Sequence, residues 1–384
     1  MKTIAVIFGG RSAEHDVSIM TAIASVIKPL ELTKQFKVEA VYISKDGSWF
    51  WDDKLKNIAL YQSGDIDDFM NKAPKVNLSF EKGLTLVKQG QLGRKQKKID
   101  VVFPAMHGTH GEDGELMGIL EMANVPYVGC NVPASVVAMD KVLSKQVTGS
   151  VGIPSTPWMW FYARELGDDR ILKEIAKLKY PLFVKPAHLG SSIGITRVEK
   201  ADKLQDALEV AAHYDNKVIV EQGVANLIEV TLPIIGNDQP VPALLEQPLV
   251  DSEEFFDFDT KYMSGGKKGG GQKSGKQGAQ GYSKIPAEVP KNVYDEAVQL
   301  GLDVYKTLGC SGIARIDMLI DSKTGKVMFN EINPLPGDLY RHNWHQAGVS
   351  STELVTRLVG YAEERWAAQQ KIATAFSTNF LKQF

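Results

Sequence analysis

Two carboxylates and an amide occur near the C-terminal end of the chain at a spacing that suits a metal ion. Residues 314–333 contain two apolar runs, ARIDMLID and KVMFNEIN, separated by the turn signal SKTG, and so predict an antiparallel hairpin. The expected register pairs Asp317 with Glu331. It also places Arg315 opposite Asn333, and all four side chains then project from one face. Facing carboxylates repel one another unless a cation lies between them, and a hard divalent ion prefers such oxygen ligands.

The opposite face of this hairpin is predicted to be apolar. Its side chains are typical of a packed core: Ile316, Met318, Ile320, Met328 and Ile332. On the polar face, Arg315 would bring positive charge to an anion that the metal also touches. The pattern favours a cation and a phosphate-like anion at one site, with an incidental charged surface hairpin as the alternative.

A glycine- and serine-rich segment predicts a phosphate contact. Residues 183–194, FVKPAHLGSSIG, place Lys185 at the end of an apolar strand and follow it with Ser191 and Ser192 in a loop between glycines. Glycines let backbone N–H groups approach a phosphate, hydroxyls add donors, and the lysine adds a point charge. The segment is neither a Walker A loop nor a dinucleotide turn. Lys141 is either a second phosphate cation or, more commonly for such a residue, an ordinary helix-surface lysine.

Polar residues at strand ends add further candidates. Glu221 and Glu229 lie at the two ends of EQGVANLIE, where they could accept hydrogen bonds from an adenine amine and a ribose hydroxyl. Glu14 lies just past the glycine turn that leaves the first strand. His107 and the HGEDG segment 110–114 lie at the end of another strand, so both loops are expected at the carboxyl edge of one α/β sheet, where ligands bind.

The elements that must position these groups predict an α/β protein. Short apolar runs at 3–10, 37–43 and 99–108 alternate with helix-length segments, as in a parallel sheet with crossover helices. Further along the chain we expect a helix, a strand–turn–strand unit, two strands and a second helix that ends before Gly309. Their ranges are 134–154, 180–198, 216–224, 227–236 and 291–308.

Bulk properties narrow the class of protein. The 384 residues are 43% hydrophobic, enough for two or three packed domains, and the net charge of −2 favours neither nucleic acid nor an acidic membrane as a partner. No apolar run approaches the roughly 20 residues that a membrane span requires. Cys130 and Cys310 fit no metal spacing and are predicted to be reduced core residues. These features predict a cytoplasmic protein that acts on small molecules.

Residues 264–281, SGGKKGGGQKSGKQGAQG, contain eight glycines, four lysines and no acidic residue. Such a segment buries too little apolar surface to offset its ordering entropy, which favours a solvated loop. The functional alternative is a lid whose lysines close over an anionic ligand.

Seven segments, in this order and across nearly the whole chain, resemble the D-alanine–D-alanine ligases of the ATP-grasp superfamily. They are GGRSAEHDVS, HGTHGEDG, MDK, FVKPAHLGSSIG, FDFDTKY, ARIDMLID and NEINPLPG. The resemblance implies an N-terminal parallel α/β domain (1–135), a central ATP-grasp domain (136–225) and a C-terminal domain (226–384) with the 264–281 loop as a lid. The last two domains, both α+β, would enclose ATP.

The resemblance also implies roles for individual residues. In the family, ATP phosphorylates one carboxylate and the amine of a second substrate then attacks. Glu14 would hold the ammonium group of the first substrate, linked to Ser191 and Tyr262, and His107 would help to hold that substrate. Arg315 and the backbone N–H of Gly337 would stabilise the oxyanion. The remaining ATP-binding and metal positions are Lys141, Lys185, Ser192, Glu221, Val224 and Glu229 for ATP, and Asp317, Glu331 and Asn333 for Mg²⁺, with two ions expected and Mn²⁺ as a substitute.

The second-substrate segment departs from the family pattern. Tyr262 favours an amine over a hydroxyl nucleophile, and Lys261 matches the lysine that helps to clamp the carboxylate of the second substrate. Asp338, however, follows the glycine where Phe or Met is usual, and His342 replaces the usual serine. His342 can still donate to a carboxylate, whereas Asp338 would attract a cationic or carboxylate-free amine.

The sequence therefore predicts an ADP-forming ligase that joins two D-amino acids, most plainly a homodimeric D-alanine–D-alanine ligase for peptidoglycan. A ligase that couples an activated amino acid to another amine in specialised metabolism is the alternative. A third hypothesis, from a different class, is a non-catalytic ATP-binding protein.

Overall fold

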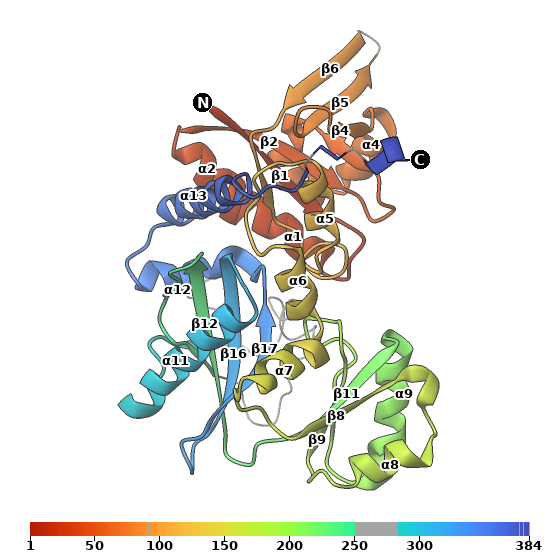
Figure 1. The fold of residues 1–384 in the computed structure, drawn as a ribbon, viewed down its shortest axis with the longest axis vertical. Helices are drawn as coiled ribbons and strands as arrows, with labels where there is room; N and C mark the ends of the chain where they lie inside the picture. Colours follow the sequence, from red (N-terminus) through yellow and green to blue (C-terminus); the bar gives the residue numbers. More distant parts are fainter. Residues whose placement is uncertain (91–92, 250–282, 376, 379, 384) are drawn as a thin grey trace.

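The computed structural model describes residues 1–90, 93–249, 283–375, 377–378 and 380–383, and it has three principal sheets arranged along the long axis of the molecule (Figure 1). Lys261, Tyr262 and the expected lid at 264–281 lie outside the described residues. The α/β fold class is confirmed.

The first sheet contains the predicted parallel strands. Its order is β3-β2-β1-β7, formed by Trp49–Trp51, Phe36–Ile43, Lys2–Gly9 and Val101–Pro104. β1 pairs in parallel with both β2 and β7. The ends of β1 and β7 therefore bring the loops of Glu14 and His107 to the same edge. This part of the prediction is confirmed.

The last long helix of the chain packs against this first sheet. α13 (Ser351–Gln369) buries Leu354, Val355 and Leu358 in the core that also contains Ile4 and Val6 of β1. Figure 1 shows α13 beside β1 and α2 (Lys28–Leu32), although these elements belong to opposite ends of the sequence. The two ends of the chain thus share one hydrophobic core, while the domain limits drawn from the sequence stay a prediction.

A second, unpredicted sheet projects from the first domain. It comprises β4 (Val76–Ser79), β5 (Thr85–Gly90) and β6 (Gly93–Lys98), paired antiparallel in that order. Figure 1 shows β5 and β6 extending away from the body of the molecule. The sequence prediction missed it because β6, GRKQKK, has no apolar residue to mark a strand.

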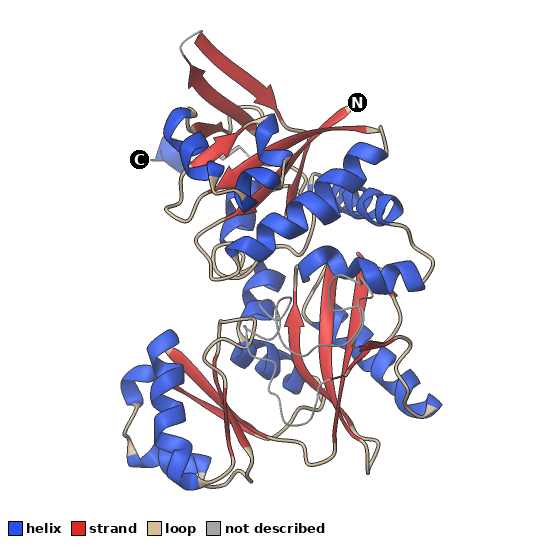
Figure 2. Cartoon of the chain, turned by 180° about the vertical axis from the view of Figure 1, so that it is seen from behind, coloured by secondary structure: helices blue, strands red, loops and turns tan. Residues whose placement is uncertain are grey.

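The central sheet has the order β10-β9-β11-β8. Its strands are Thr196–Val198, Leu182–Pro186, Lys217–Gln222 and Trp158–Tyr162. The predicted strand–turn–strand unit is confirmed, since Thr196 pairs with Val184 in an antiparallel ladder. Figure 2 shows the helices of this unit, α8 (Asp169–Ile175) and α9 (Leu204–Tyr214), on one face of the sheet.

The third sheet has the order β13-β12-β16-β17. It comprises Val241–Pro242, Leu227–Gly236, Gly312–Asp321 and Val327–Asn333. α11 (Lys291–Thr307) covers one face with the predicted stripe, and the side chains of Val293, Ala297 and Val304 are buried there. Gly309 follows the helix at φ +66°, a conformation that glycine adopts without a Cβ penalty.

The helix predicted at 134–154 is wrong as a single element. The structure has two helices, α6 (Val132–Met139) and α7 (Lys141–Ser150), with Asp140 between them at φ −92° and ψ 106°. The Asp140 carboxylate accepts hydrogen bonds from the backbone N–H groups of Val142 and Leu143 and so caps α7. A capping aspartate ends the apolar periodicity of one helix and begins the next.

The remaining helices and strands are short. They are α1 (His15–Met20), a π-helical segment Thr21–Ile27, α3 (Ala59–Gln62), α4 (Asp65–Lys72), α5 (Glu115–Met122), α12 (Arg341–Gln346), β14 (Gln247–Pro248), β15 (Ser283–Lys284) and 3₁₀ turns at Asp53–Lys56, Ala163–Glu165, Ala201–Lys203, Gly337–Tyr340 and Phe380–Gln383. Across the described part of the chain, none of the helices combines the length and apolar character that spanning a membrane requires. Cys130 and Cys310 are buried free thiols, as expected.

Candidate active site

The hairpin of β16 and β17 has the predicted register. Asp317 pairs with Glu331, and Arg315 pairs with Asn333. The Asn333 Nδ2 atom lies 3.1 Å from Asp317 Oδ2, and the Arg315 Nε atom donates to Asp317 Oδ1 at 2.7 Å. These polar side chains therefore meet on one face of the sheet, while the buried side chains of Ile316 and Ile332 lie on the other.

One residue of the predicted apolar face is misplaced. The pairing passes from Asp317–Glu331 to Met318–Phe329, so Asn330 is an extra residue in β17. On the N-terminal side of this bulge, the side chains of β17 alternate in the opposite sense. Phe329 therefore packs in the core on the face where the sequence analysis placed Met328. A bulge moves side chains to the opposite face without changing strand length. It also leaves Glu331 and Asn333 facing Asp317 and Arg315.

Lys141 is not a helix-surface lysine. It is the first residue of α7 and only 7% exposed. Its Nζ atom donates to the Leu189 carbonyl at 2.7 Å and lies 3.3 Å from Glu331 Oε2. The side chain therefore joins the phosphate-loop candidate to the hairpin, which favours the first of the two readings of this residue.

Three charged side chains, of Lys145, Glu221 and Lys185, form a largely buried cluster beside Lys141. Glu221, at the end of β11, lies 2.7 Å from Lys145 Nζ through Oε1 and is ion-paired with Lys185 through Oε2. Burial opposes the charge of Glu221, but the two lysines outweigh it and lower the pKa of the carboxyl to about 2. Glu331 and Glu229 also raise the pKa of Lys185 against the effect of burial. The sequence prediction missed Lys145, which lies one helical turn after Lys141 on the same face of α7.

The phosphate-loop candidate is tied down through His188. Its Nδ1 atom lies 3.0 Å from both carboxylate oxygens of Asp215, and its Nε2 atom lies 3.2 Å from Asp140 Oδ2. Hydrogen bonds to these two carboxylates raise the pKa of His188 to about 9, so the ring is an imidazolium at neutral pH. Lys217 adds a 2.5 Å contact to Asp140. The loop after β9 is therefore linked by charge to both α7 and β11.

Glu14 and Ser191 come together as the resemblance implies. Ser191 Oγ donates to Glu14 Oε1, although 177 residues separate the two. Ser191 and Ser192 have φ values of 53° and 60°, a left-handed conformation that is uncommon without glycine. A Cβ atom on Gly190 would lie 3.2 Å from Glu14 Oε2, so the loop approaches the carboxylate closely.

His107 is buried with both ring nitrogens engaged. Nδ1 lies 3.1 Å from the Leu335 carbonyl oxygen, which can only accept, so Nδ1 carries the proton. Nε2 accepts from Thr21 Oγ1 at 2.9 Å, and the Thr21 oxygen in turn accepts from the Asp338 N–H at 3.0 Å. Burial lowers the pKa of His107, which keeps the ring neutral. In this geometry the ring supports the turn at Asp338.

Glu112 was missed by the sequence prediction. It lies on the loop after β7 and is 6% exposed, with Oε1 accepting from the Gly108 N–H at 2.8 Å. Burial, reinforced by the nearby charge of Glu14, raises the pKa of Glu112 to about 8. The carboxyl is therefore mostly protonated at neutral pH. Its only signal in the sequence is its place in HGEDG beside His107.

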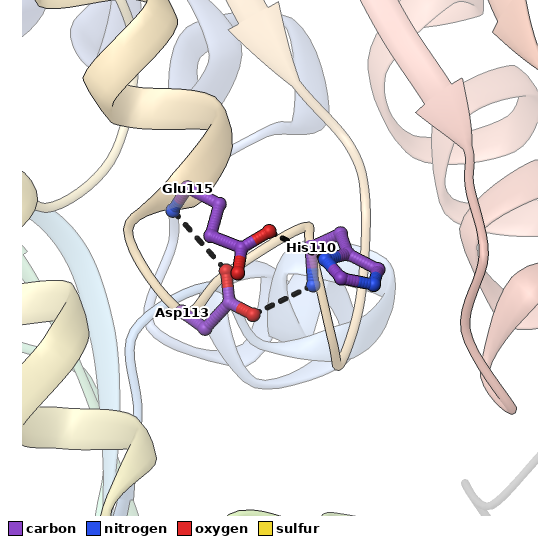
Figure 3. A group of neighbouring side chains, drawn as sticks. All are labelled: His110, Asp113 and Glu115. Atoms are coloured by element: carbon purple, nitrogen blue, oxygen red, sulfur yellow. Dashed lines mark hydrogen bonds and ion pairs between the residues drawn. The ribbon is translucent and has the colours of Figure 1, made fainter. Parts of the chain in front are cut away.

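The same loop carries His110, Asp113 and Glu115 at the start of α5 (Figure 3). Asp113 accepts from the His110 N–H at 2.7 Å and from the Glu115 N–H at 3.2 Å, while His110 Nδ1 contacts Glu115 Oε2. These hydrogen bonds satisfy the groups within the loop, and they account for the cluster as a local turn and helix start.

Residues 337–343 form the second-substrate segment of the sequence analysis, called the acceptor turn from here on. Their backbone is unusual. Asp338, Leu339 and Tyr340 have φ values of 54°, 52° and 53°, three successive non-glycine residues in the left-handed region. Each such residue costs roughly 1 kcal/mol or more, so packing must hold the turn in place. Leu339 is fully buried in the core shared with β1, which provides that packing.

Asp338 does not present an unpaired negative charge. Its Oδ1 atom accepts from Arg341 at 3.0 Å and 2.7 Å, and from the Ser25 hydroxyl. The sequence prediction could not see Arg341 as its partner, because the left-handed turn folds the two together. The charge expected to attract a cationic amine is therefore largely compensated.

His342 has a buried carboxylate as its partner. Its Nε2 atom lies 2.9 Å and 3.1 Å from the two oxygens of Glu246, a residue that the sequence prediction missed. Asn343 Nδ2 donates to the same carboxylate at 3.0 Å. Burial opposes the charge of Glu246, but its partners, His342 first among them, lower its pKa below the ordinary value.

The other predicted residues lie around this site. Gly337 begins the acceptor turn, and a Cβ atom there would be 3.8 Å from Val17 in α1. Val224 follows β11 and is half-buried, and Glu229 is exposed on β12. The charge of Glu229 acts on Lys185, so both ends of EQGVANLIE lie near the lysine.

The donor set fits a divalent ion beside a polyphosphate. Two carboxylates and one amide face one another across β16 and β17, and Lys141 lies 3.3 Å from one of the carboxylates. Oxygen donors of this kind suit Mg²⁺, and the lysines beside them suit phosphate oxygens. Two α+β units that bring these groups together, next to a parallel α/β domain, define an ATP-grasp ligase.

Comparison with known proteins identifies the family. The D-ala D-ala ligase N-terminus model matches residues 3–130, and the D-ala D-ala ligase C-terminus model matches residues 147–360. A D-alanine–D-alanine ligase of Acetivibrio thermocellus is 36% identical over 381 residues, covering 95% of this chain and 96% of the relative. The chain belongs to the D-alanine–D-alanine ligase family. It is accordingly an ADP-forming ligase that uses ATP, with Mg²⁺ as the usual metal of the family.

Solved structures agree with this assignment. The D-alanine–D-alanine ligase of Coxiella burnetii has a TM-score of 0.79 at 27% identity, covering 96% of each chain. The VanG D-Ala:D-Ser ligase of Enterococcus faecalis has a TM-score of 0.76 at 31% identity, covering 94% of this chain and 99% of that one. The non-catalytic alternative has no support from these comparisons.

Proposed function

We propose that this enzyme joins two molecules of D-alanine, with hydrolysis of ATP to ADP, to make D-alanyl-D-alanine for peptidoglycan. The proposal rests on one observation. The side chains of Asp317, Glu331 and Asn333 meet on one face of a hairpin. Arg315 and Lys141 lie beside them. The names of the curated relatives supply the substrate.

Separate groups of residues bind the first D-alanine and ATP. Glu14, with Ser191 bonded to it, binds the ammonium group of the first D-alanine. Lys141, Lys185 and Ser192 bind the phosphates, while Val224 and Glu229 line the adenosine side. Glu221 holds Lys145 and Lys185 in place and meets the adenine amine only through the part of its carboxylate that they leave free.

The transfer steps rely on positive charge and on donors fixed in advance. Asp317, Glu331 and Asn333 would hold two Mg²⁺ ions, or Mn²⁺ in their place, and these ions would supply positive charge that neutralises the phosphates. Arg315 and the Gly337 N–H stabilise the oxyanion that forms when the amine attacks the acyl phosphate. His107 acts by holding the Asp338 turn through Thr21. Lys261 and Tyr262 complete the substrate contacts in this proposal.

A second candidate is a ligase of the same chemistry with a different amine as second substrate. It is favoured by the pairing of His342, in the acceptor turn, with Glu246 and by the likeness to the VanG D-Ala:D-Ser ligase. The proposal also includes a cytoplasmic location, a homodimer, the three domain limits given above and a lid at 264–281.

A screen of phosphate release tests both candidates. Purified enzyme is given ATP, Mg²⁺ and single or paired D- and L-amino acids and simple amines, and the products are weighed by mass spectrometry. Fastest release with D-alanine alone, with the homodipeptide as product, supports the first candidate. A faster mixed pair, for example D-alanine with D-serine, replaces it with the second, and ATP binding without ADP formation from any substrate overturns both.

A further inference from the structure

The amine that attacks must first lose a proton. At neutral pH an amino acid carries an ammonium group, which has no free electron pair and cannot form the new C–N bond. Water is one route for this proton, but a positioned side chain near the acyl group is a faster one. If the enzyme is the amine ligase proposed above, on which this inference rests, one of its side chains can accept this proton.

A carboxylate–imidazole pair joins the acceptor turn, through His342, to Glu246 beside β12. Glu246 is 3% exposed and ionised, so it can only accept, and the His342 nitrogen that faces it at 2.9 Å must carry a proton. Asn343 donates to the same carboxylate and fixes it further. In the neutral ring this arrangement fixes the tautomer of His342, with the proton on Nε2 and the electron pair on Nδ1, which is the form that a general base requires.

The pair lies beside the residues proposed for the oxyanion and the metal. Thr231 pairs with Asp317 across β12 and β16, and its backbone exchanges hydrogen bonds of 2.8 Å and 2.9 Å with Glu246 on the other side. Glu246 is therefore two strand spacings, about 10 Å, from Asp317. The hairpin and the carboxylate are parts of one continuous sheet surface.

Tyr340 connects the imidazole to Arg315. The rings of Tyr340 and His342 have centroids 4.9 Å apart, and the Arg315 guanidinium lies 5.0 Å from the Tyr340 ring centroid. Among the described residues, no hydrogen bond engages His342 Nδ1, and the side chain is 16% exposed. The groups that face the ring are thus Glu246 and Tyr340, with Arg315 beyond the tyrosine and Arg341 already paired with Asp338.

We propose that His342, oriented by Glu246, is the base that takes the proton from the ammonium group of the second substrate. The ammonium proton passes to Nδ1, and the freed electron pair forms the C–N bond at the carbonyl carbon of the acyl phosphate. The bond from that carbon to the phosphate oxygen then breaks, and inorganic phosphate leaves. The second nitrogen proton leaves with the phosphate or to water, and the imidazolium releases its own proton to solvent.

Hydroxylamine separates this role from other roles of the same side chain. It is a nucleophile that is largely unprotonated at neutral pH, so it needs no base to attack an acyl phosphate. His342→Asn keeps a polar side chain of similar reach but removes the proton acceptor. The variant is expected to lower kcat/KM for D-alanine as second substrate by about 100-fold or more. Hydroxamate formation from D-alanine and hydroxylamine is expected to change by less than about threefold, because that reaction bypasses general-base catalysis.

Two further variants complete the experiment. Glu246→Gln is expected to show the same preference for hydroxylamine with a smaller loss, because the imidazole remains but is less well oriented. His345→Asn, on the same helix, removes an exposed histidine that bonds to Ser351 and is expected to match the wild type with both nucleophiles. Thermal melting of each variant reports on folding.

The outcomes distinguish the base from the alternatives. An equal loss with both nucleophiles in His342→Asn would overturn the proposal in favour of a structural role. A rise in KM for the second D-alanine at unchanged kcat would overturn it in favour of carboxylate binding. If wild-type enzyme forms hydroxamate but no amide with any amine, the proposed function fails instead, and the proposed proton transfer fails with it.

Discussion

The nucleotide side and the acceptor side of this site are built in different ways. On the nucleotide side, Lys145, Glu221 and Lys185 extend from a helix and two adjacent strands and form a charge cluster in which Lys145 and Glu221 are buried and Lys185 is largely so. On the acceptor side, three successive residues with a left-handed backbone, of which Asp338 is the first, precede and position His342. Regular elements hold the first group, whereas an irregular turn held by core packing holds the second.

The difference has a physical consequence for how each side tolerates change. Buried charges in regular elements depend on one another, so that the loss of one leaves the others uncompensated in a medium of low dielectric constant. The acceptor turn depends instead on Leu339 in the core, and its charged side chains are partly exposed. Changes of charge are therefore expected to be costly on the nucleotide side and mild at Asp338.

The largest effect is expected at the metal hairpin. Asp317→Asn removes a charged oxygen ligand and should lower kcat by about 1,000-fold or more, equivalent to several kcal/mol of lost charge stabilisation. ADP release at saturating ATP and D-alanine measures it. Asp321→Asn, at the half-buried far end of the same strand, is the control and should retain wild-type activity. Comparable activity in the two variants would refute the assignment of Asp317 as a ligand.

The buried cluster should show the largest effect on stability. Glu221→Gln leaves Lys145 and Lys185 without their counter-charge, and the free energy of unfolding should fall by about 3–5 kcal/mol. Chemical denaturation provides the measurement. Glu174→Gln, which breaks an exposed pair with Lys177, should cost less than about 1 kcal/mol. A similar small cost for both changes would mean that the cluster contributes little to folding.

The His188 network predicts a dependence on pH. Because the folded pKa of His188 is raised to about 9, its stabilising charge is fully present below the unfolded value of about 6.5 and is lost as the pH rises through 9. The KM for ATP should therefore rise above pH 9. His188→Asn should show a KM about tenfold higher already at pH 7.5, a loss of about 1.4 kcal/mol.

Two variants provide controls for this prediction. His188→Arg keeps the positive charge and should remove the alkaline rise in KM, since arginine stays protonated. His213→Asn, at an exposed position near the end of α9, should follow the wild-type profile. An alkaline rise that persists unchanged in His188→Arg would assign the titration to another group.

The smallest effect is expected at Asp338. Asp338→Asn tolerates the left-handed backbone and keeps an acceptor for Ser25, but it breaks the ion pair with Arg341. Both kcat and the KM for the second substrate should change by less than about threefold, consistent with a partly exposed pair worth about 1 kcal/mol or less. A tenfold or larger change in the preference between D-alanine and an uncharged or cationic amine would restore the attraction hypothesis for Asp338.

Much of the site could be predicted because its key elements are local and periodic. The turn SKTG and two alternating strands specify the pairing of Asp317 with Glu331 before any tertiary contact is known. The same reasoning placed Met328 on the face of Ile316 and Ile332 and failed, although Met328 is buried, because the bulge at Asn330 is a property of how β17 meets β16. The break at Asp140 was missed for a related reason, since its capping role appears only once α6 and α7 turn away from each other.

The residues that sequence reasoning missed have partners far away along the chain. Glu246 lies 96 residues from His342, and Lys145 lies 76 residues from Glu221. Neither position stands in a motif that marks chemistry by itself. Only the folded chain brings a carboxylate to an imidazole, or a second lysine to a glutamate, and burial then changes their charge states.

The sequence by itself determined the pairing of the hairpin carboxylates, because strand alternation and a turn are short-range geometry, and the order of seven segments along it gave the resemblance that implies the class of chemistry. The tertiary structure alone decided which partner each charge has: Asp338 pairs with Arg341, Glu221 pairs with two lysines, and Glu246 accepts hydrogen bonds from His342 and Asn343. The physical reason is that electrostatic energy depends on distance and burial in space, and neither quantity is fixed by separation along the chain.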